Sequence, residues 1–153
     1  RQQYHDAGIV ADFVQDNHSR SVRGVLRGLH YQHRHPQAKL VSVSLGSVYD
    51  VAVDLRQGSP TFGRAVGAEL SAENGRQLFV PRGFAHGFLV LSDTVDFCYK
   101  CDDYYAPGDE YGVLWSDPAL SIDWPPLAEE FLLSEKDAAA PLLSDVPASL
   151  LFE

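Results

Sequence analysis

Two strand-like stretches carry side chains that could exchange protons with a substrate. Arg27 and His30 interrupt one apolar run, and Tyr99 follows Phe97 at the spacing that places both on one face of a strand. A His and a Tyr that face the same interior would form an acid–base pair, because imidazole titrates near neutral pH. Taken singly, each of these residues is better explained by ordinary packing. Together they make proton-transfer chemistry a hypothesis to weigh.

The spacing of Arg27 and His30 poses a geometric requirement. The two residues are separated by an odd number, so regular alternation sends their side chains to opposite faces of a strand. Gly28 lies between them and could host a bulge, which would turn both toward one cavity. A buried Arg costs free energy unless it meets an anion. If both belong to one site, we expect a bulge at Gly28 and an anionic ligand near Arg27.

Two motifs resemble the metal-binding motifs of cupin barrels. Pro81-x-Gly83-x-x-His86 is similar to the second of these motifs, and His33-x-His35 is similar to the start of the first. The first motif requires a Glu four residues after its second His, and this chain has Lys39 there. An ammonium group cannot ligate a cation and repels one. We therefore expect a barrel of this shape without a metal.

Cys98 and Cys101 form a second candidate for special chemistry. A redox pair with this spacing normally begins a helix, where the helix terminus lowers one thiol pKa. Here the pair lies in a strand-like stretch, and an odd separation points the two thiols to opposite faces. One such pair also supplies too few ligands for a structural zinc site. The spacing therefore favours two unpaired thiols.

The elements that would position these residues are mostly short strands. In Leu40–Leu45 apolar residues alternate with serines, and from Tyr49 to Leu55 apolar residues again occupy every second position. Ser134 begins a capped short helix that Pro141 ends. This pattern predicts an all-β sandwich or barrel with a short C-terminal helical segment. The other expected strands are Val22–Gln32, Arg64–Leu70, Gln77–Val80, Gly87–Leu91 and Val95–Lys100.

Length, composition and charge limit the possible partners. The chain has 153 residues, 45% of them hydrophobic, which predicts a single domain over residues 1–153 with a sizeable core. A net charge of −9 opposes general binding to nucleic acid or anionic membrane. No apolar run approaches the roughly 20 residues of a membrane span. The two cysteines do not suggest a disulfide framework, so a reducing cytoplasm is expected.

Several motifs in register resemble the dTDP-4-dehydrorhamnose 3,5-epimerase family from about Phe13 to Leu143. The motifs follow the order found in that family, and as a set they are highly specific. They are Gln15-Asp16-Asn17-His18-Ser19, Val25-Leu26-Arg27-Gly28-Leu29-His30-Tyr31-Gln32, Asp50-Val51-Ala52-Val53-Asp54, Ser59-Pro60-Thr61-Phe62-Gly63, Pro81-x-Gly83-Phe84-Ala85-His86-Gly87-Phe88, Tyr99-Lys100, Asp103-Tyr104-Tyr105, Trp115-x-Asp117-Pro118 and Leu133-Ser134-x-Lys136-Asp137.

The resemblance implies a fold, an activity and a set of site residues. The implied fold is a cupin-type jelly-roll (double-stranded β-helix) barrel, usually dimeric and without a cofactor. The implied reaction inverts C3 and C5 of dTDP-4-dehydro-6-deoxy-D-glucose and gives dTDP-4-dehydro-L-rhamnose. It makes His30 the base, Tyr99 the opposite-face acid, Lys39 the enolate stabiliser and Asp137 the residue that orients His30. The implied substrate-binding residues are Gln15, Asp16, Asn17, Arg27, His86, Glu110 and Lys136.

The reaction explains why such residue types are needed. A proton beside a ketone can be removed because the charge moves to the carbonyl oxygen, where a fixed cation stabilises it as donors do in an oxyanion hole. Inversion then needs a second proton source across the ring. Lys39 would supply the cation that a metal supplies in other cupins. The family also has an N-terminal segment with nucleotide contacts, exchanged between subunits, and we expect that segment to be missing from this chain.

Other interpretations stay open on the sequence alone. The chain could invert only C3 or only C5 of a related dTDP-4-keto-deoxysugar, or it could be a non-catalytic sugar-nucleotide-binding cupin. Asp137 lies three residues after Ser134, where a residue of a helix-capping motif would lie. Lys136 could be a solvated surface residue, and Glu110 an ordinary loop acid. Asp50 could be a hydrogen-bonded core carboxylate, and we leave it outside the expected site.

Overall fold

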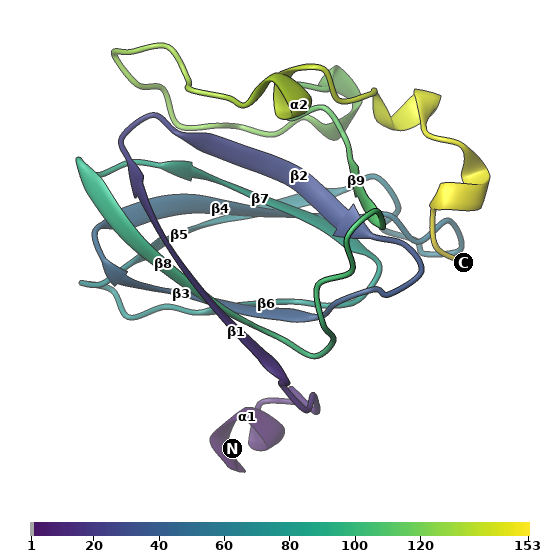
Figure 1. Ribbon diagram of the computed structural model, residues 1–153, viewed down its shortest axis with the longest axis horizontal. Coiled ribbons are helices and arrows are strands. Elements are labelled where there is room, and N and C mark those ends of the chain that lie inside the picture. The colour runs from purple at the N-terminus through teal and green to yellow at the C-terminus, as the bar shows by residue number, and fades with distance from the viewer. Residues whose placement is uncertain (1) are drawn as a thin grey trace.

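Strands dominate residues 2–153, which the computed structural model describes, and they form two antiparallel sheets that face each other (Figure 1). A four-stranded sheet has the order β1-β8-β3-β6, and a five-stranded sheet has the order β5-β4-β7-β2-β9. The strands are β1 (Gln15–Val22), β2 (Leu26–Gln32), β3 (Lys39–Leu45), β4 (Ser47–Asp54), β5 (Ala65–Ser71), β6 (Leu78–Val80), β7 (Phe84–Val90), β8 (Thr94–Cys101) and β9 (Glu110–Gly112). This arrangement confirms the all-β jelly-roll prediction.

One end of the space between the sheets is filled with apolar side chains. Phe88 of β7 stacks on Phe97 of β8 with ring centroids 4.1 Å apart, and Val90 and Val95 lie in the same buried cluster. Further along both strands the inward-facing residues become polar, since His86 precedes Phe88 and Tyr99 follows Phe97. The packed end therefore holds the sheets together and leaves the polar end free to form a cavity.

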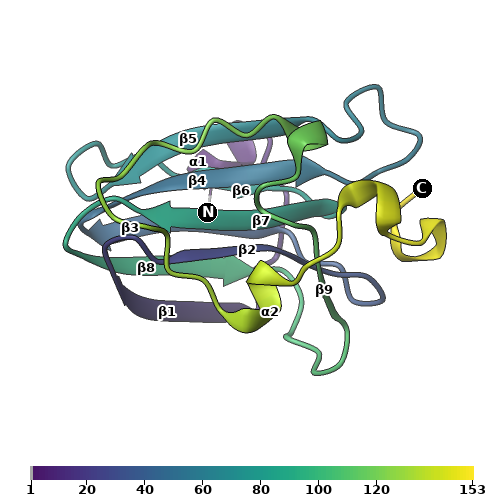
Figure 2. The same ribbon diagram turned by 90° about the horizontal axis from the view of Figure 1, so that it is seen from above.

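A second core lies on the outer face of the five-stranded sheet. Val51 and Val53 of β4 pack there against Leu120, Leu143 and other residues of the segment that follows β9. Figure 2 shows this segment crossing the sheet, with helix α2 (Glu135–Ala138) beside β2. Because the segment is pinned by this core, α2 has a fixed position next to the polar end of β2.

Most expected strands are confirmed within a few residues, but the stretch Val22–Gln32 is not one strand. Val22 ends β1, a turn at Gly24 with φ of +83° follows, and β2 begins at Leu26. Strand β1 was not predicted, because its sequence from Gln15 is almost entirely polar. It is an edge strand, and its partner strand is β8. The side chains of Gln15 and Asn17, near its N-terminal end, face the space between the two sheets. A polar strand of this kind lacks the apolar alternation that sequence patterns detect.

The predicted C-terminal helix is confirmed as α2. The Ser134 hydroxyl accepts a hydrogen bond from the Asp137 backbone N–H at 3.1 Å, which caps the helix start. The structure adds a short N-terminal helix, α1 (Gln2–Asp6), and three 3₁₀ turns, η1 (Pro118–Leu120), η2 (Leu143–Asp145) and η3 (Ala148–Leu150). Throughout the described residues, every helix is too short or too polar to cross a bilayer.

Candidate active site

A cavity of about 440 Å³ opens between the two sheets at their polar end. We call it the interior cavity. Eight of the eleven residues predicted for the site line it, namely Gln15, Asn17, Arg27, His30, Lys39, His86, Tyr99 and Glu110. The walls come from β1, β3 and β8 on one side and from β2, β7 and β9 on the other. The two sheets thus bring together residues that are far apart in sequence.

His30 is anchored to helix α2 through Asp137. The His30 Nε2 lies 2.5 Å from Asp137 Oδ1, and the other carboxylate oxygen accepts from the Gly28 N–H at 3.3 Å. A carboxylate that accepts with both oxygens leaves the proton on Nε2, so the neutral ring keeps a free lone pair on Nδ1. The Asp137 carboxylate is therefore engaged with His30, while the helix cap is made by the Ser134 side chain.

The expected bulge is present between Arg27 and His30. The register of β2 against β7 shifts between these two residues, and both line the interior cavity. Gly28 has φ of +120°, and a Cβ atom there would lie 2.5 Å from Gly87 Cα. Only glycine allows this backbone shape at so close an approach. Two glycines facing each other on neighbouring strands thus turn Arg27 and His30 toward the same space.

Lys39 and Tyr99 lie on the wall opposite His30. They occupy neighbouring strands of the four-stranded sheet, with Lys39 Nζ 5.9 Å from the centre of the Tyr99 ring. Burial lowers the pKa of the Lys39 ammonium and raises the pKa of the Tyr99 phenol. The phenol is therefore well protonated near neutral pH and can donate. The cavity consequently has a potential base on one wall and a proton donor with a cation on the other.

His86, in the cavity wall, contacts the buried carboxylate of Asp50. Its Nε2 is 2.9 Å from Asp50 Oδ1 and 3.0 Å from Oδ2, and its ring stacks on Phe97 with centroids 6.2 Å apart. Asp50 is fully buried and His86 is 7% exposed. The Asp50 interpretation as a hydrogen-bonded core carboxylate is confirmed. The pair holds the His86 ring in one orientation, with Nε2 on the carboxylate.

Charged residues surround the entrance beside His30. Lys136 of α2 forms an ion pair with Glu110 of β9, and Glu110 Oε1 is 4.0 Å from His30 Nδ1. Arg27 donates to the Ser21 hydroxyl at 3.2 Å. Lys136, Asp137 and Arg27 also line an adjoining hollow of about 390 Å³. Two cationic side chains therefore flank the entrance, and one of them already has an acidic partner.

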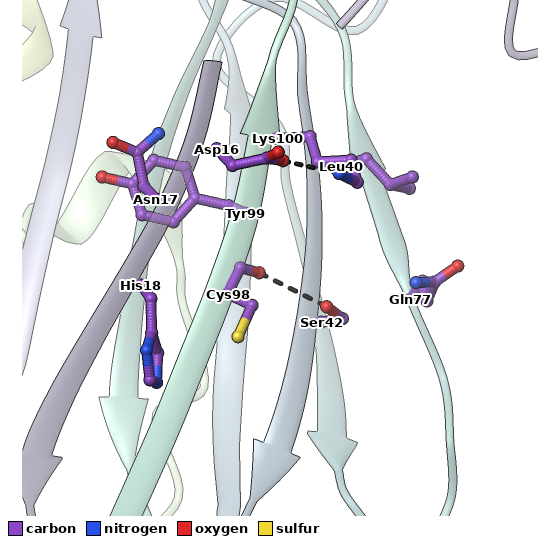
Figure 3. A pocket seen from close by; sticks show the side chains of 9 residues that line it. All are labelled: Asp16, Asn17, His18, Leu40, Ser42, Gln77, Cys98, Tyr99 and Lys100. Atoms are coloured by element: carbon purple, nitrogen blue, oxygen red, sulfur yellow. Dashed lines mark hydrogen bonds and ion pairs between the residues drawn. The ribbon is translucent and has the colours of Figure 1, made fainter.

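Asp16 is the one predicted site residue that lines neither the interior cavity nor the adjoining hollow beside His30. Alternation along β1 turns Gln15 and Asn17 inward and Asp16 outward. In Figure 3 the Asp16 carboxylate points toward Lys100, with Nζ 2.5 Å from Oδ1. Both line a shallow hollow of about 360 Å³ on the outer face of the four-stranded sheet. The motif match covered three successive residues, and a strand cannot direct all three to one side.

The rival chemistries find no support in the geometry of residues 2–153. Within this range, no three side chains of the His, Cys, Asp or Glu type are grouped so that they could hold a metal ion. Cys98 lines the outer hollow, whereas Cys101 lines the interior cavity, so the two thiols lie on opposite faces as predicted. The CxxC pair thus acts as two separate cysteines, both free.

Five polar residues of the cavity wall were not predicted from the sequence, namely Ser19, Gln32, Gln37, Cys101 and Tyr105. Cys101 and Gln32 each lie two positions beyond a predicted residue, Tyr99 and His30, and strand alternation alone could have identified them. Tyr105, in the loop after β8, also lines the cavity and is 53% exposed. No periodic pattern marks a loop residue of this kind. Its place at the cavity depends on how the loop folds back.

Comparisons with known proteins agree on one family. The family described as dTDP-4-dehydrorhamnose 3,5-epimerase matches residues 1–145. The enzyme of that name from Pseudomonas aeruginosa is 60% identical over 138 residues, covering 90% of this chain and 76% of its own length. A crystal structure of dTDP-6-deoxy-D-glucose-3,5-epimerase from Legionella pneumophila, in complex with dTDP-4-keto-L-rhamnose, superimposes with a TM-score of 0.95 at 58% identity. The match covers 99% of this chain and 81% of that one.

A relative with a narrower activity is also similar. The 3'-monoepimerase from Streptomyces bikiniensis, crystallised with dTDP-quinovose, is 38% identical with a TM-score of 0.85. The match covers 94% of this chain and 74% of that one. The identity to the Pseudomonas and Legionella enzymes is thus considerably higher. By sequence and by structure, this chain belongs to the dTDP-4-dehydrorhamnose 3,5-epimerase family.

Proposed function

We propose that this chain inverts C3 and C5 of dTDP-4-dehydro-6-deoxy-D-glucose to give dTDP-4-dehydro-L-rhamnose. The observation that carries the proposal is the placement of His30 and Tyr99 on facing walls of one cavity, with Lys39 beside Tyr99. A keto-sugar between these walls would have a base on one face and an acid on the other. The family membership supports the same substrate class.

The first step is removal of a proton beside the C4 ketone by His30. The Nε2 atom is held on Asp137, so the lone pair on Nδ1 accepts the proton. The resulting imidazolium lies against the Asp137 carboxylate and 4.0 Å from Glu110 Oε1. Both carboxylates stabilise this cation. Asp137 therefore acts through His30, by fixing its ring and its tautomer.

Lys39 stabilises the charge that proton removal places on the C4 oxygen. In the buried wall of the cavity an ammonium group interacts with an enolate far more strongly than it would in water. Donors of this kind contribute about 2.7–4 kcal/mol to related reactions. The cation is attached to the chain, so this scheme needs no metal. The expectation of a reaction without cofactor stays a prediction.

Tyr99 returns a proton to the opposite face of the ring. Its phenol is kept protonated because burial raises its pKa. Delivery from the side opposite to removal is what inverts a carbon centre. For a second inversion, His30 must pass its proton to solvent and the Tyr99 phenolate must take one up from solvent. The adjoining hollow reaches His30 and offers a path for the first of these transfers. The same pair of residues can then act at the other carbon.

The nucleotide end of the substrate needs cations and a flat surface. Arg27 and Lys136 at the entrance suit a diphosphate, since a guanidinium fork matches phosphate oxygens. Tyr105 presents an exposed aromatic ring at the cavity, and base–aromatic stacking is a common mode of nucleobase binding. Gln15, Asn17 and His86 would contact the sugar. Asp16 is left out because its side chain points outward.

We further propose that the chain forms a homodimer, as the family resemblance implies. Light scattering coupled to size-exclusion chromatography would measure its mass in solution. A mass of twice 16.9 kDa is expected, and the mass of one chain would contradict the proposal. A cytoplasmic location remains a prediction from the sequence.

Exchange of substrate protons in D₂O tests the activity. The substrate is incubated with the chain, and NMR follows deuterium at C3 and C5. Exchange at both carbons with formation of the L-rhamno product is the expected result. Exchange at one carbon alone would select a single-centre epimerase, and binding of dTDP without exchange would select a non-catalytic module. Either outcome contradicts the proposed 3,5-epimerase.

A further inference from the structure

One buried glutamine holds the backbone on both sides of Tyr105. Gln32 is 6% exposed and ends strand β2 in the cavity wall. Its side-chain oxygen accepts from the Ala106 N–H at 2.9 Å, and its side-chain nitrogen donates to the Tyr104 carbonyl at 3.4 Å. These two backbone groups flank Tyr105 directly. A single amide therefore pairs with the loop much as a neighbouring strand would.

Further bonds fix the orientation of this amide and of the loop. The Gln32 nitrogen also donates to the His35 carbonyl at 2.8 Å, so the amide cannot flip without placing its oxygen against two carbonyl groups. The Tyr105 N–H donates to the Gln15 side-chain oxygen at 2.9 Å. The loop is thus held at three consecutive residues by two glutamine side chains from β1 and β2.

We propose that Gln32 is a positioning residue that holds the Tyr105 ring where the nucleobase of the substrate binds. This inference rests on the proposed function, because it takes a dTDP-sugar as the ligand. Tyr105 is 53% exposed, so its own packing does little to fix the position of its ring. We call the two bonds from Gln32 to Tyr104 and Ala106 the clamp. Without the clamp, ligand binding would have to order the loop, and the entropy cost of ordering would weaken the affinity. Gln32 acts through Tyr105 and leaves the proton-transfer residues alone.

Calorimetric titration with two probes separates positioning from general damage. dTDP carries the base, and inorganic pyrophosphate carries only the charged groups. Gln32→Glu keeps the size of the side chain but turns an acceptor oxygen toward two carbonyls, and Gln32→Ala removes all three bonds. For both variants we expect dTDP affinity to fall about tenfold while pyrophosphate affinity changes less than about twofold. Turnover should show a raised KM with kcat nearly unchanged.

Matched variants test whether the effect passes through Tyr105. Gln57→Ala is the control, because the Gln57 side chain also donates to a backbone carbonyl, that of Ala148 in the C-terminal segment, at 3.1 Å. This variant should leave both affinities unchanged. Tyr105→Ala should reproduce the loss of dTDP affinity. In the Tyr105→Ala background, Gln32→Ala should add no further loss, because coupled residues are not additive.

Several outcomes would overturn the inference. They are unchanged dTDP binding in both Gln32 variants, an equal loss for dTDP and pyrophosphate, or additive losses in the double variant. Hydrogen exchange of the unmodified chain gives a test that needs no variant, because the Tyr105 and Ala106 amides should be protected. Exchange at the rate of a free peptide would exclude the clamp. The D₂O exchange experiment tests the epimerase activity independently of these binding measurements. The clamp can therefore be supported while the epimerase proposal fails, and the epimerase proposal can be supported while the clamp fails.

Discussion

His30 Nε2 and Asp137 Oδ1 lie 2.5 Å apart although 107 positions separate the two residues in the chain. One belongs to a strand of the sheet, and the other to a helical turn that the C-terminal segment places beside that strand. Since the other oxygen of the carboxylate accepts from the Gly28 N–H, both of its oxygens are bound to residues of β2. The catalytic proposal depends on this contact, because it decides which nitrogen of His30 is free.

Replacing Asp137 with Asn should slow the reaction without weakening binding. An amide can donate to Nε2 and so stabilise the wrong tautomer of His30, as in the corresponding change in a serine protease triad. We expect kcat to fall about 100-fold or more, with KM changed less than about threefold. Steady-state kinetics would measure this. Asp145→Asn, an exposed acid of the same C-terminal segment, is the control and should keep full turnover. Equal kcat for the two variants would contradict the role of Asp137.

The alkaline limit of activity should reflect Lys39. Burial lowers the pKa of this ammonium below its ordinary value of 10.5, whereas burial raises that of the Tyr99 phenol above 10.0. As pH rises, Lys39 should therefore lose its charge, and kcat should fall, at a pH below 10.5. In Lys39→Arg any remaining activity should persist to higher pH, because a guanidinium stays charged. A profile with the same alkaline limb in both proteins would rule out Lys39 as its source.

Removing the Tyr99 hydroxyl should separate proton loss from inversion. Tyr99→Phe retains His30 and Lys39, so substrate recovered from D₂O should still contain deuterium beside the ketone. Product formation should fall about 100-fold or more, because the opposite face lacks a donor. NMR of the recovered sugar measures both quantities. Tyr49→Phe, whose ring packs against Trp124 on the outer face of the sheet, is the control. Parallel loss of exchange and inversion in Tyr99→Phe would contradict the assignment.

A side chain at Gly28 should destabilise the fold around the site. In Gly28→Ala the new Cβ would lie 2.5 Å from Gly87 Cα and 2.8 Å from the His86 carbonyl oxygen. Backbone must move to relieve both contacts, and we expect the free energy of unfolding to fall by about 3 kcal/mol. Urea unfolding would measure it. Gly58→Ala has no atom within 4 Å of its Cβ and should change stability little. Similar midpoints for the two variants would contradict the close approach.

The amino-acid sequence by itself determined much of this molecule. Period-2 alternation is a local property of a strand, so the pattern alone placed Tyr99 with Phe97 and separated Cys98 from Cys101. The same local reasoning, with Lys39 in the place of a metal-binding Glu, favoured a barrel without a metal site. The family motifs then supplied the expected fold, the substrate class and most of the residues that line the cavity.

Tertiary structure decided what local patterns could not. Whether Arg27 and His30 share a cavity depends on a register shift between two strands, and whether Asp137 serves as a cap or reaches His30 depends on where a distant segment packs. The outward position of Asp16 follows from the strand β1, which a polar sequence conceals. The physical reason is common to all three. Contacts between segments far apart in the chain are set by the packing of the whole core, and no short stretch of sequence contains that information.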